Sequence, residues 1–202
     1  MVHFRTVVVG ILSVNCQIVW HPESKDAYIV DPGAEAGKII AALAELAVTP
    51  RAILLTHGHI DHIQAIPELR SKWPLPLWCH AAELPLLLSP DNALLPWMPA
   101  CRDLPQPVSD LPLLPGFEFT VLHTPGHTPG GVCYHFPGEK TVLTGDTLFK
   151  GTYGRTDLPG GNQKQIMHSI KKILFALPDN TVVCPGHHAS STISQEKHSG
   201  IY

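Results

Sequence analysis

Four residues of types that bind metal ions lie within one short stretch of the chain. They are His57, His59, Asp61 and His62, in Thr56-His57-Gly58-His59-Ile60-Asp61-His62. Imidazole nitrogens and carboxylate oxygens are ligands for divalent zinc, iron and manganese. On a regular helix residues two apart point to different sides, and on a strand His62 would point away from the other three, so in neither could the four side chains converge. Gly58 accepts dihedral angles closed to other residues, so the spacing predicts a tight loop that carries a metal site.

Three more ligand-type residues follow later in the chain. They are His127, Asp146 and His187, and each stands directly after a glycine and beyond a short apolar run. Loops at the carboxyl ends of strands are where α/β proteins build their sites. Seven ligands are too many for one tetrahedral ion and suit two ions that share one ligand. Each of the three would be weak alone, because His or Asp after Gly is usually a loop or turn residue.

The apolar pattern predicts an α/β protein in which these loops follow strands. Strands are predicted at 6–9, 16–20, 27–30, 51–55, 77–79, 117–122, 132–136, 141–144 and 181–184, and helices at 34–47, 63–72, 81–88 and 163–177. Eight prolines between residues 85 and 115 predict an irregular segment there. Two successive strand-rich blocks with helices favour two sheets packed face to face with helices outside, in a single domain over 1–202.

The composition excludes several classes of partner. The formal net charge of -3 provides no basic field for nucleic acid. A membrane partner is not expected, because no apolar stretch approaches the roughly 18 residues that span a bilayer. The N-terminus lacks the pattern of a signal peptide, which predicts a cytoplasmic protein. Five cysteines without paired spacing are expected to be reduced thiols. The oligomeric state cannot be predicted from these features.

Five motifs occur in order along the chain: THxHxDH, TPGHTPG, TGDTLF, GRTD and PGH. In these motifs the chain resembles the metallo-β-lactamase superfamily, and most of all its small glyoxalase II-like (hydroxyacylglutathione hydrolase-like) hydrolases. The resemblance runs from about Val14 to about Thr192. It implies the αββα sandwich of that family, two mixed sheets face to face with helices outside, with the site at one edge between the sheets.

The resemblance also implies a role for each ligand. His57, His59 and His127 would hold one metal ion, Asp61, His62 and His187 would hold a second, and Asp146 would bridge them. Asp31 matches a VDPG motif that is expected to support the metal loop. The alternative for Asp31, a turn former before Pro32-Gly33, stays equally open.

The reaction that the resemblance implies is hydrolysis by a metal-bridging hydroxide. Asp61 would be a ligand that also orients this nucleophile. Relatives with a thiolate-rich site carry a cysteine at the position of Asp146, so the oxygen ligand here favours thioesters over β-lactams. The expected substrate is a small-molecule thioester such as an S-acylglutathione. The expected cofactors are two divalent ions, zinc first, with iron or manganese as alternatives.

Two residues are predicted to bind the substrate. Arg155, in the GRTD motif, matches a position that contacts a glutathione carboxylate in relatives, and Tyr153 lies beside it in the sequence. Pairing of Arg155 with Asp157, and rim packing of Tyr153, remain alternatives. Separately, an apolar cluster in the proline-rich segment is predicted to pack on the sandwich, and a role in covering the site is a hypothesis. The cluster consists of Leu94, Leu95, Trp97 and Met98.

The main alternative function is a persulfide dioxygenase of the same superfamily. Such enzymes use one iron, which His57, His127 and Asp146 would hold. His187 in Pro-Gly-His, and Leu158-Pro159 after GRTD, depart from that pattern. A metal-binding protein without catalysis and a ribonuclease of the superfamily are less favoured, because of the full ligand set and the acidic balance respectively.

Overall fold

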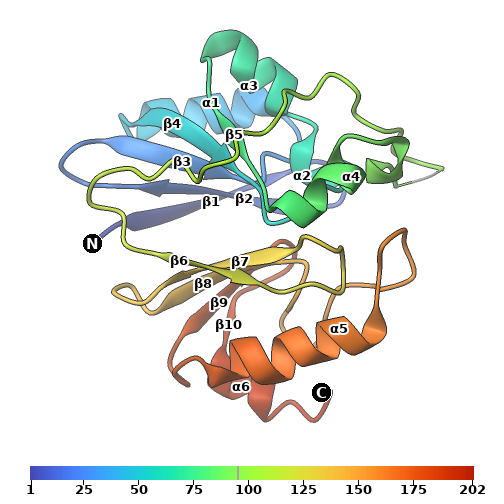
Figure 1. Ribbon diagram of the computed structural model, residues 1–202. Coiled ribbons are helices and arrows are strands. Elements are labelled where there is room, and N and C mark those ends of the chain that lie inside the picture. The colour runs from blue at the N-terminus through green and yellow to red at the C-terminus, as the bar shows by residue number, and fades with distance from the viewer. Residues whose placement is uncertain (95) are drawn as a thin grey trace. The chain divides into compact units, whose positions relative to one another are not determined.

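The backbone divides into two compact units. The computed structural model describes residues 1–94 and 96–202, and the units are Met1–Phe117 and Glu118–Tyr202. Each unit holds one five-stranded sheet with its own helices (Figure 1). Within the described residues, no helix is long and apolar enough to cross a membrane. The expectation of a single domain over the whole chain stays a prediction.

The sheet of the first unit is mixed. Its strands, in spatial as well as chain order, are β1 (His3–Val9), β2 (Val14–Trp20), β3 (Asp26–Val30), β4 (Thr49–Leu54) and β5 (Leu77–Trp78). The first three strands pair antiparallel, whereas β4 pairs parallel with both β3 and β5. The carboxyl ends of β3 and β4 therefore lie at the same edge, which brings Asp31 next to the histidine-rich segment.

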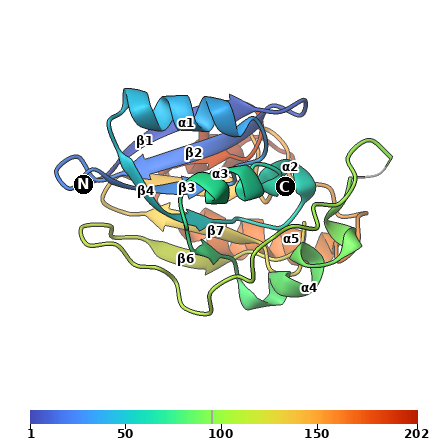
Figure 2. The same cartoon turned by 90° about the horizontal axis from the view of Figure 1, so that it is seen from above.

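Helices cover one face of this sheet. The helical elements are α1 (Ala36–Glu45), α2 (Ile60–Ile63), α3 (Ile66–Lys72), η1 (Ala81–Glu83), α4 (Leu84–Leu87) and η2 (Pro90–Asn92). Both views show α1 and α3 on the same face (Figures 1 and 2). Ile39 and Leu43 of α1 and Ile66 and Leu69 of α3 join one buried cluster with the strands. Their helical spacing explains the burial, which contributes roughly 1.5–3 kcal/mol for each such side chain.

The second unit also consists of one five-stranded sheet with its own helices, but its strands are connected differently. Its strands are β6 (Thr120–His123), β7 (Val132–Phe136), β8 (Thr141–Gly145), β9 (Val182–Pro185) and β10 (Ser191–Thr192), in the spatial order β10-β9-β8-β7-β6. Only β8 and β9 pair parallel. Ile166, Ile170 and Leu174 are fully buried at four-residue spacing and anchor the helical segment on this sheet. That segment consists of α5 (Gln163–His168), η3 (Ser169–Ile173) and η4 (Leu174–Ala176), and α6 (Ile193–Lys197) follows β10.

The structure corrects the predicted conformation of the histidine-rich stretch. We expected one tight loop, but Asp61 and His62 lie in the short helix α2. His59 is the extended residue before this helix, with φ -69° and ψ 148°. The loop therefore supplies only the first two histidines, and the first helical turn supplies Asp61 and His62. The helix predicted at 63–72 is in fact two helices, α2 and α3.

Two other predicted elements differ from the structure, and two short elements were missed. The strand expected at 117–122 begins at Thr120, because Phe117 belongs to the first unit, where its ring packs edge-on against Tyr28 at 4.8 Å. The helix expected at 163–177 becomes a π-helical turn and then a 3-10 turn after His168. An apolar stripe at four-residue spacing does not distinguish these forms from an α-helix. The short elements β10 and α6 were not predicted at all.

The proline-rich segment is irregular, as its composition predicts. Its described residues contain the end of α4, the turn η2 and a bridge between Leu94 and Met98. Leu94 and Met98 are partly buried against the first unit's core, so their predicted packing is confirmed. Trp97 is 80% exposed, so the prediction was wrong for this residue. Leu95 lies outside the described residues.

Candidate metal centre

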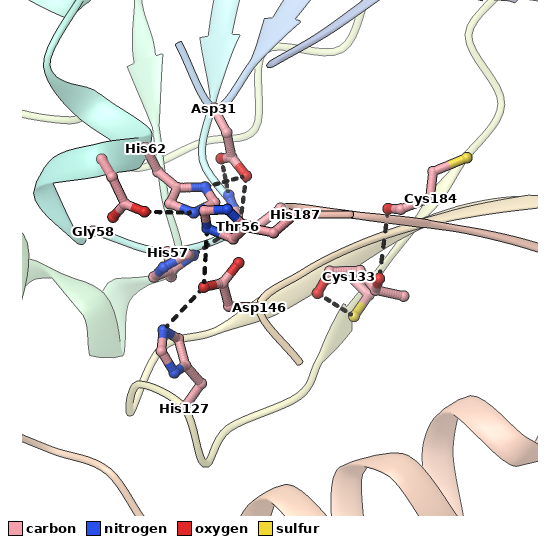
Figure 3. A network of polar contacts seen from close by, with 12 residues as sticks. Asp31, Thr56, His57, Gly58, His62, His127, Cys133, Asp146, Cys184 and His187 are labelled. Atoms are coloured by element: carbon pink, nitrogen blue, oxygen red, sulfur yellow. Dashed lines mark hydrogen bonds and ion pairs between the residues drawn. The ribbon is translucent and has the colours of Figure 1, made fainter. Parts of the chain in front are cut away.

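In the first unit, Asp31 ties the end of β3 to the histidine-rich stretch. Its Oδ1 accepts a hydrogen bond from the Thr56 backbone N–H at 2.8 Å, and its Oδ2 accepts one from the Thr56 hydroxyl at 2.6 Å. The Nδ1 of His62 lies 3.1 Å from the same Oδ2. Figure 3 shows the carboxylate directed at both partners. Asp31 is buried, and directly after β3 its backbone adopts a left-handed conformation with φ +52°.

These hydrogen bonds decide which nitrogen of each imidazole is available to a metal. The carboxylate of Asp31 can only accept, so His62 donates from Nδ1 and presents Nε2 as the lone-pair nitrogen. The Thr56 hydroxyl gives its one proton to Asp31, so at 3.0 Å it accepts from Nδ1 of His57. Both histidines are therefore set to coordinate through Nε2.

The four ligand-type residues of the stretch are buried close together. His57, His59, Asp61 and His62 are 2%, 2%, 5% and 0% exposed. The ring of His57 lies 5.0 Å from that of His59 and 4.1 Å from that of His62, between centroids. Asp61 Oδ2 is 3.7 Å from His62 Nε2, beyond hydrogen-bond range. Two ligands about 2.1 Å from one tetrahedral ion would lie about 3.4 Å apart, so this spacing fits a shared ion.

Two supporting residues were missed by the sequence analysis. Thr56 precedes the first histidine in the motif and could have been found there. Glu83 gave no local signal, yet its fully buried Oε1 accepts a hydrogen bond from the Gly58 backbone N–H at 2.8 Å. This bond fixes the residue between His57 and His59. Contacts across 25 residues of sequence cannot be read from a motif.

In the second unit, two imidazoles approach one oxygen of one carboxylate. The Nε2 atoms of His127 and His187 each lie 3.6 Å from Oδ2 of Asp146 (Figure 3). Asp146 directly follows β8 and His187 follows β9, whereas His127 lies in the loop between β6 and β7. These distances are again too long for hydrogen bonds and close to the separation of neighbouring metal ligands.

The backbone around His127 determines its orientation. Its Nδ1 is 2.7 Å from the carbonyl oxygen of Arg155, which can only accept, so Nε2 is left for a metal. Gly126 has a φ of +134°, and a Cβ there would lie 2.2 Å from the backbone nitrogen of Ile166. Only glycine therefore allows the loop to approach the start of α5 this closely.

The predicted substrate residues lie on the same unit. The Nε and Nη2 of Arg155 donate to the two carboxylate oxygens of Asp157, both at 2.7 Å. This exposed pair is the alternative that the sequence left open, and the guanidinium lowers the pKa of Asp157 to about 2. The Tyr153 hydroxyl accepts from Nε2 of Gln163 at 2.9 Å, so its own proton remains available to a ligand.

The five cysteines are thiols, as predicted. Cys16 is fully buried, and burial, followed by the nearby Asp31 charge, raises the pKa of its thiol well above the usual value. The Sγ of Cys133 lies 3.2 Å from the Thr124 hydroxyl, which is 3.1 Å from that of Thr147. These polar groups pack behind the Asp146 segment and have no role as ligands in the arrangement described above.

Comparison with known proteins identifies the family. The model of the "Metallo-beta-lactamase superfamily" matches residues 9–187. The hydroxyacylglutathione hydrolase GloC of Haemophilus influenzae is 36% identical over 93% of this chain and 92% of its own. The crystal structure of BLEG-1, a B3 metallo-β-lactamase, has a TM-score of 0.85 at 35% identity and covers 98% of both chains. The crystal structure of TTHA1623 in a di-iron-bound form has a TM-score of 0.83 at 36% identity. The match covers 96% of this chain and 98% of TTHA1623.

Two mixed five-stranded sheets with helices, together with these similarities, confirm the predicted α/β sandwich of the family. The histidine and aspartate clusters are ligand sets of the type that holds divalent metal ions. The chain belongs to the metallo-β-lactamase superfamily.

Proposed function

We propose that this protein is a dinuclear metal-dependent hydrolase of thioesters such as S-acylglutathione. The ligands of both units would combine: His57, His59 and His127 around one ion, Asp61, His62 and His187 around the other, and Asp146 between them. The observation that carries the proposal is the single Asp146 oxygen at 3.6 Å from two imidazole nitrogens. A carboxylate shared by two histidines from different loops is what a bridging ligand requires.

Several features support the joining of the two ligand sets. The matched family model spans residues 9–187 and so includes both units. The di-iron relative covers 96% of the chain, again including both units. In each unit the hydrogen bonds described above leave Nε2 of a histidine as the coordinating nitrogen. The donors are all nitrogen and carboxylate oxygen, which suits zinc, iron or manganese. Zinc remains our first choice, and the di-iron form of TTHA1623 makes iron the principal alternative.

The chain's own residues would control the position and protonation of the reacting groups. When bound, the two ions would lower the pKa of a shared water and polarise the substrate carbonyl. Asp61 is held with its backbone carbonyl against Gly33, where a Cβ would lie 1.7 Å from that oxygen. Its carboxylate is thereby fixed beside His62, where it would orient the attacking water and accept its proton.

The substrate class rests on Arg155 and on the relative GloC. A glutathione thioester carries carboxylates, and a guanidinium binds a carboxylate through paired hydrogen bonds. Asp157 uses the Nε–Nη2 edge of Arg155, which leaves the remaining edge for a ligand. Tyr153, which keeps a donor proton, would provide a second contact on the same rim.

Kinetics with two thioesters would test this assignment. Arg155→Met should raise KM for S-lactoylglutathione about tenfold or more, because a charge-assisted contact is lost. KM for a thioester whose thiol carries no carboxylate should stay unchanged. Asp157→Asn is the matched control, since it breaks the same ion pair and keeps the arginine. If Arg155→Met impaired both substrates equally, or matched Asp157→Asn, Arg155 would be structural.

The B3 metallo-β-lactamase relative favours β-lactams as a second candidate substrate class. Both classes contain an acyl carbon open to attack by water, so the ligand set alone does not separate them. We expect kcat/KM for S-lactoylglutathione to exceed that for a cephalosporin by roughly a hundredfold or more. The reverse order would replace the thioester assignment and leave the metal centre intact.

A persulfide dioxygenase, the alternative function, would need fewer metal ligands than a dinuclear hydrolase. It needs only one iron and three of the seven residues. The proposal of two ions therefore depends on Asp61, His62 and His187. The Asp61–His62 distance of 3.7 Å and the His187–Asp146 distance of 3.6 Å are close to the 3.6 Å between His127 and Asp146. Oxygen consumption on glutathione persulfide by a protein with one iron would favour the dioxygenase.

A further inference from the structure

The loop formed by residues 149–155 lies directly behind two of the proposed ligands. The carbonyl oxygen of Arg155 accepts the hydrogen bond from Nδ1 of His127 at 2.7 Å. Gly154 packs so closely that a Cβ would lie 1.9 Å from the carbonyl oxygen of Asp146 and 3.0 Å from His127 Nδ1. Any shift of this loop would therefore move His127, Asp146 or both.

Two residues far along the chain hold the same loop. Oε2 of Glu196, a residue only 2% exposed, accepts a hydrogen bond from the Gly151 backbone N–H at 2.8 Å. The Tyr202 hydroxyl lies 2.9 Å from the carbonyl oxygen of Thr152 and 3.1 Å from the same Glu196 oxygen. The Tyr202 ring also packs at 5.5 Å, edge to face, against Phe175. The tyrosine and the glutamate therefore form one connected contact with the loop.

In this pair a phenol that can donate a hydrogen bond lies beside the carboxyl group of Glu196. Burial, and then the Glu196 charge, raise the pKa of the Tyr202 phenol well above its usual value, so the hydroxyl stays protonated. A buried carboxylate needs such donors, because desolvation without hydrogen bonds is costly. Gly151, with φ +72°, presents its N–H to the carboxylate in a conformation that favours glycine.

We propose that Glu196 and Tyr202 are positioning residues for the metal centre, acting through the 149–155 loop on His127 and Asp146. The inference rests on the proposed metal-dependent function. It assigns a role in metal retention to side chains that are not ligands and touch no reacting atom. Outer hydrogen-bond partners of metal ligands commonly change affinity 10- to 100-fold, so an effect of about tenfold is expected.

The test compares Tyr202→Phe with wild type and with a neighbouring control. The phenylalanine keeps the ring packing and removes only the hydroxyl. Lys197→Met is the control, because Lys197 follows Glu196 in α6 and its ammonium group pairs at 2.6 Å with Asp179. Metal retention is measured by competition with a chromophoric zinc chelator. Hydrogen–deuterium exchange of residues 149–155 is measured in the metal-free protein, as a readout independent of activity.

We expect Tyr202→Phe to lose zinc at about tenfold lower chelator concentration and to exchange faster within the loop, with Lys197→Met unchanged in both. Glu196→Gln should show the same pattern as Tyr202→Phe. Zinc retention and loop exchange equal to wild type in Tyr202→Phe would overturn the inference. Equal losses in Lys197→Met would also overturn it, since the effect would then be one of general stability. A wild-type protein that binds no zinc, iron or manganese would instead refute the proposed function itself.

Discussion

At the scale of single residues, Asp31 organises the first ligand set. Its two oxygens accept from the Thr56 backbone, the Thr56 hydroxyl and His62, so one carboxylate fixes two histidines, one of them through the threonine. The hydroxyl between Asp31 and His57 determines which imidazole nitrogen carries the proton. The orientation of these two imidazoles thus depends on Asp31, which lies 25 positions before Thr56 in the sequence.

Asp31→Ala should therefore weaken both the metal centre and the fold. It leaves three buried donors without their acceptor, which should lower the free energy of unfolding by roughly 2–4 kcal/mol. Metal affinity should fall about 10- to 100-fold. Urea unfolding of the metal-free protein and chelator competition measure the two effects. Asp26→Ala is the control at the other end of β3, because the Asp26 side chain pairs with the half-exposed Arg51 and its loss should cost below about 1 kcal/mol.

The prediction for Asp31 would be contradicted by a variant that keeps its metal ions as tightly as wild type. A loss of stability alone, with unchanged affinity, would reduce Asp31 to the turn former that the sequence also allowed. The control separates these outcomes from a general effect of removing an acid from β3.

At the scale of elements, glycines allow backbone segments to approach the ligands. In the second unit, a Cβ on Gly154 would meet the Asp146 carbonyl oxygen at 1.9 Å. Gly154→Ala should push the 149–155 loop away from Asp146 and His127. We expect a loss of roughly 1–3 kcal/mol in unfolding free energy, together with weaker metal binding.

Gly138→Ala provides the matched comparison for this prediction. Gly138 lies in the turn between β7 and β8, and a Cβ there would have no atom within 4 Å. Its substitution should change the unfolding free energy by no more than about 1 kcal/mol and leave metal binding unaltered. Equal thermal melting curves and metal contents for the two variants would contradict the role assigned to the Gly154 contact.

Tyr28 anchors another element, the segment that leads out of the first unit. Its hydroxyl donates to the Pro112 carbonyl oxygen at 2.6 Å and accepts from the Leu114 N–H at 2.8 Å. Burial raises the pKa of this phenol to about 12. Because the folded pKa lies above the usual value of about 10, the related stability is fully present below pH 10. It is lost as the pH rises from about 10 towards 12, since the unfolded chain releases the proton first.

Tyr28→Phe should remove both the contact and this pH dependence. At pH 7 the variant should be less stable by about 1–2 kcal/mol, because two partly buried backbone groups, the Pro112 carbonyl and the Leu114 N–H, lose a partner. The stability advantage of wild type should then shrink between about pH 10 and 12. Urea titrations of both proteins from pH 7 to 11.5 would measure this. A difference that stays constant over the range would show that Tyr28 does not titrate as described.

At the scale of the whole molecule, the sequence could predict the fold class and where the ligand-bearing segments lie. His127, Asp146 and His187 each follow a strand, as the apolar runs before them indicate. The pattern could not predict that Asp61 and His62 lie on a helical turn, because four residues contain too little periodicity. It also could not find Glu83, Glu196 or Tyr202, whose partners are distant in sequence. Hydrophobic periodicity reports local structure, and such contacts depend on the tertiary fold.

The two units carry ligand-type residues of the same chemistry, and the dinuclear centre that we propose needs both sets. In each unit, ligand atoms lie 3.6 to 3.7 Å apart, near the separation expected around a shared ion. The family match spans both units. We therefore propose two metal ions per chain, in a dinuclear centre that requires the ligands of both units.

The most direct test is elemental analysis of the purified chain after loading with zinc and removal of excess metal. If the centre is dinuclear, the wild type should retain two ions per chain. His187→Ala, which loses a proposed ligand of only the second ion, should retain one. The rate at which His187→Ala hydrolyses S-lactoylglutathione should fall because the second ion is lost. One ion per wild-type chain, or none above trace level, would contradict the account.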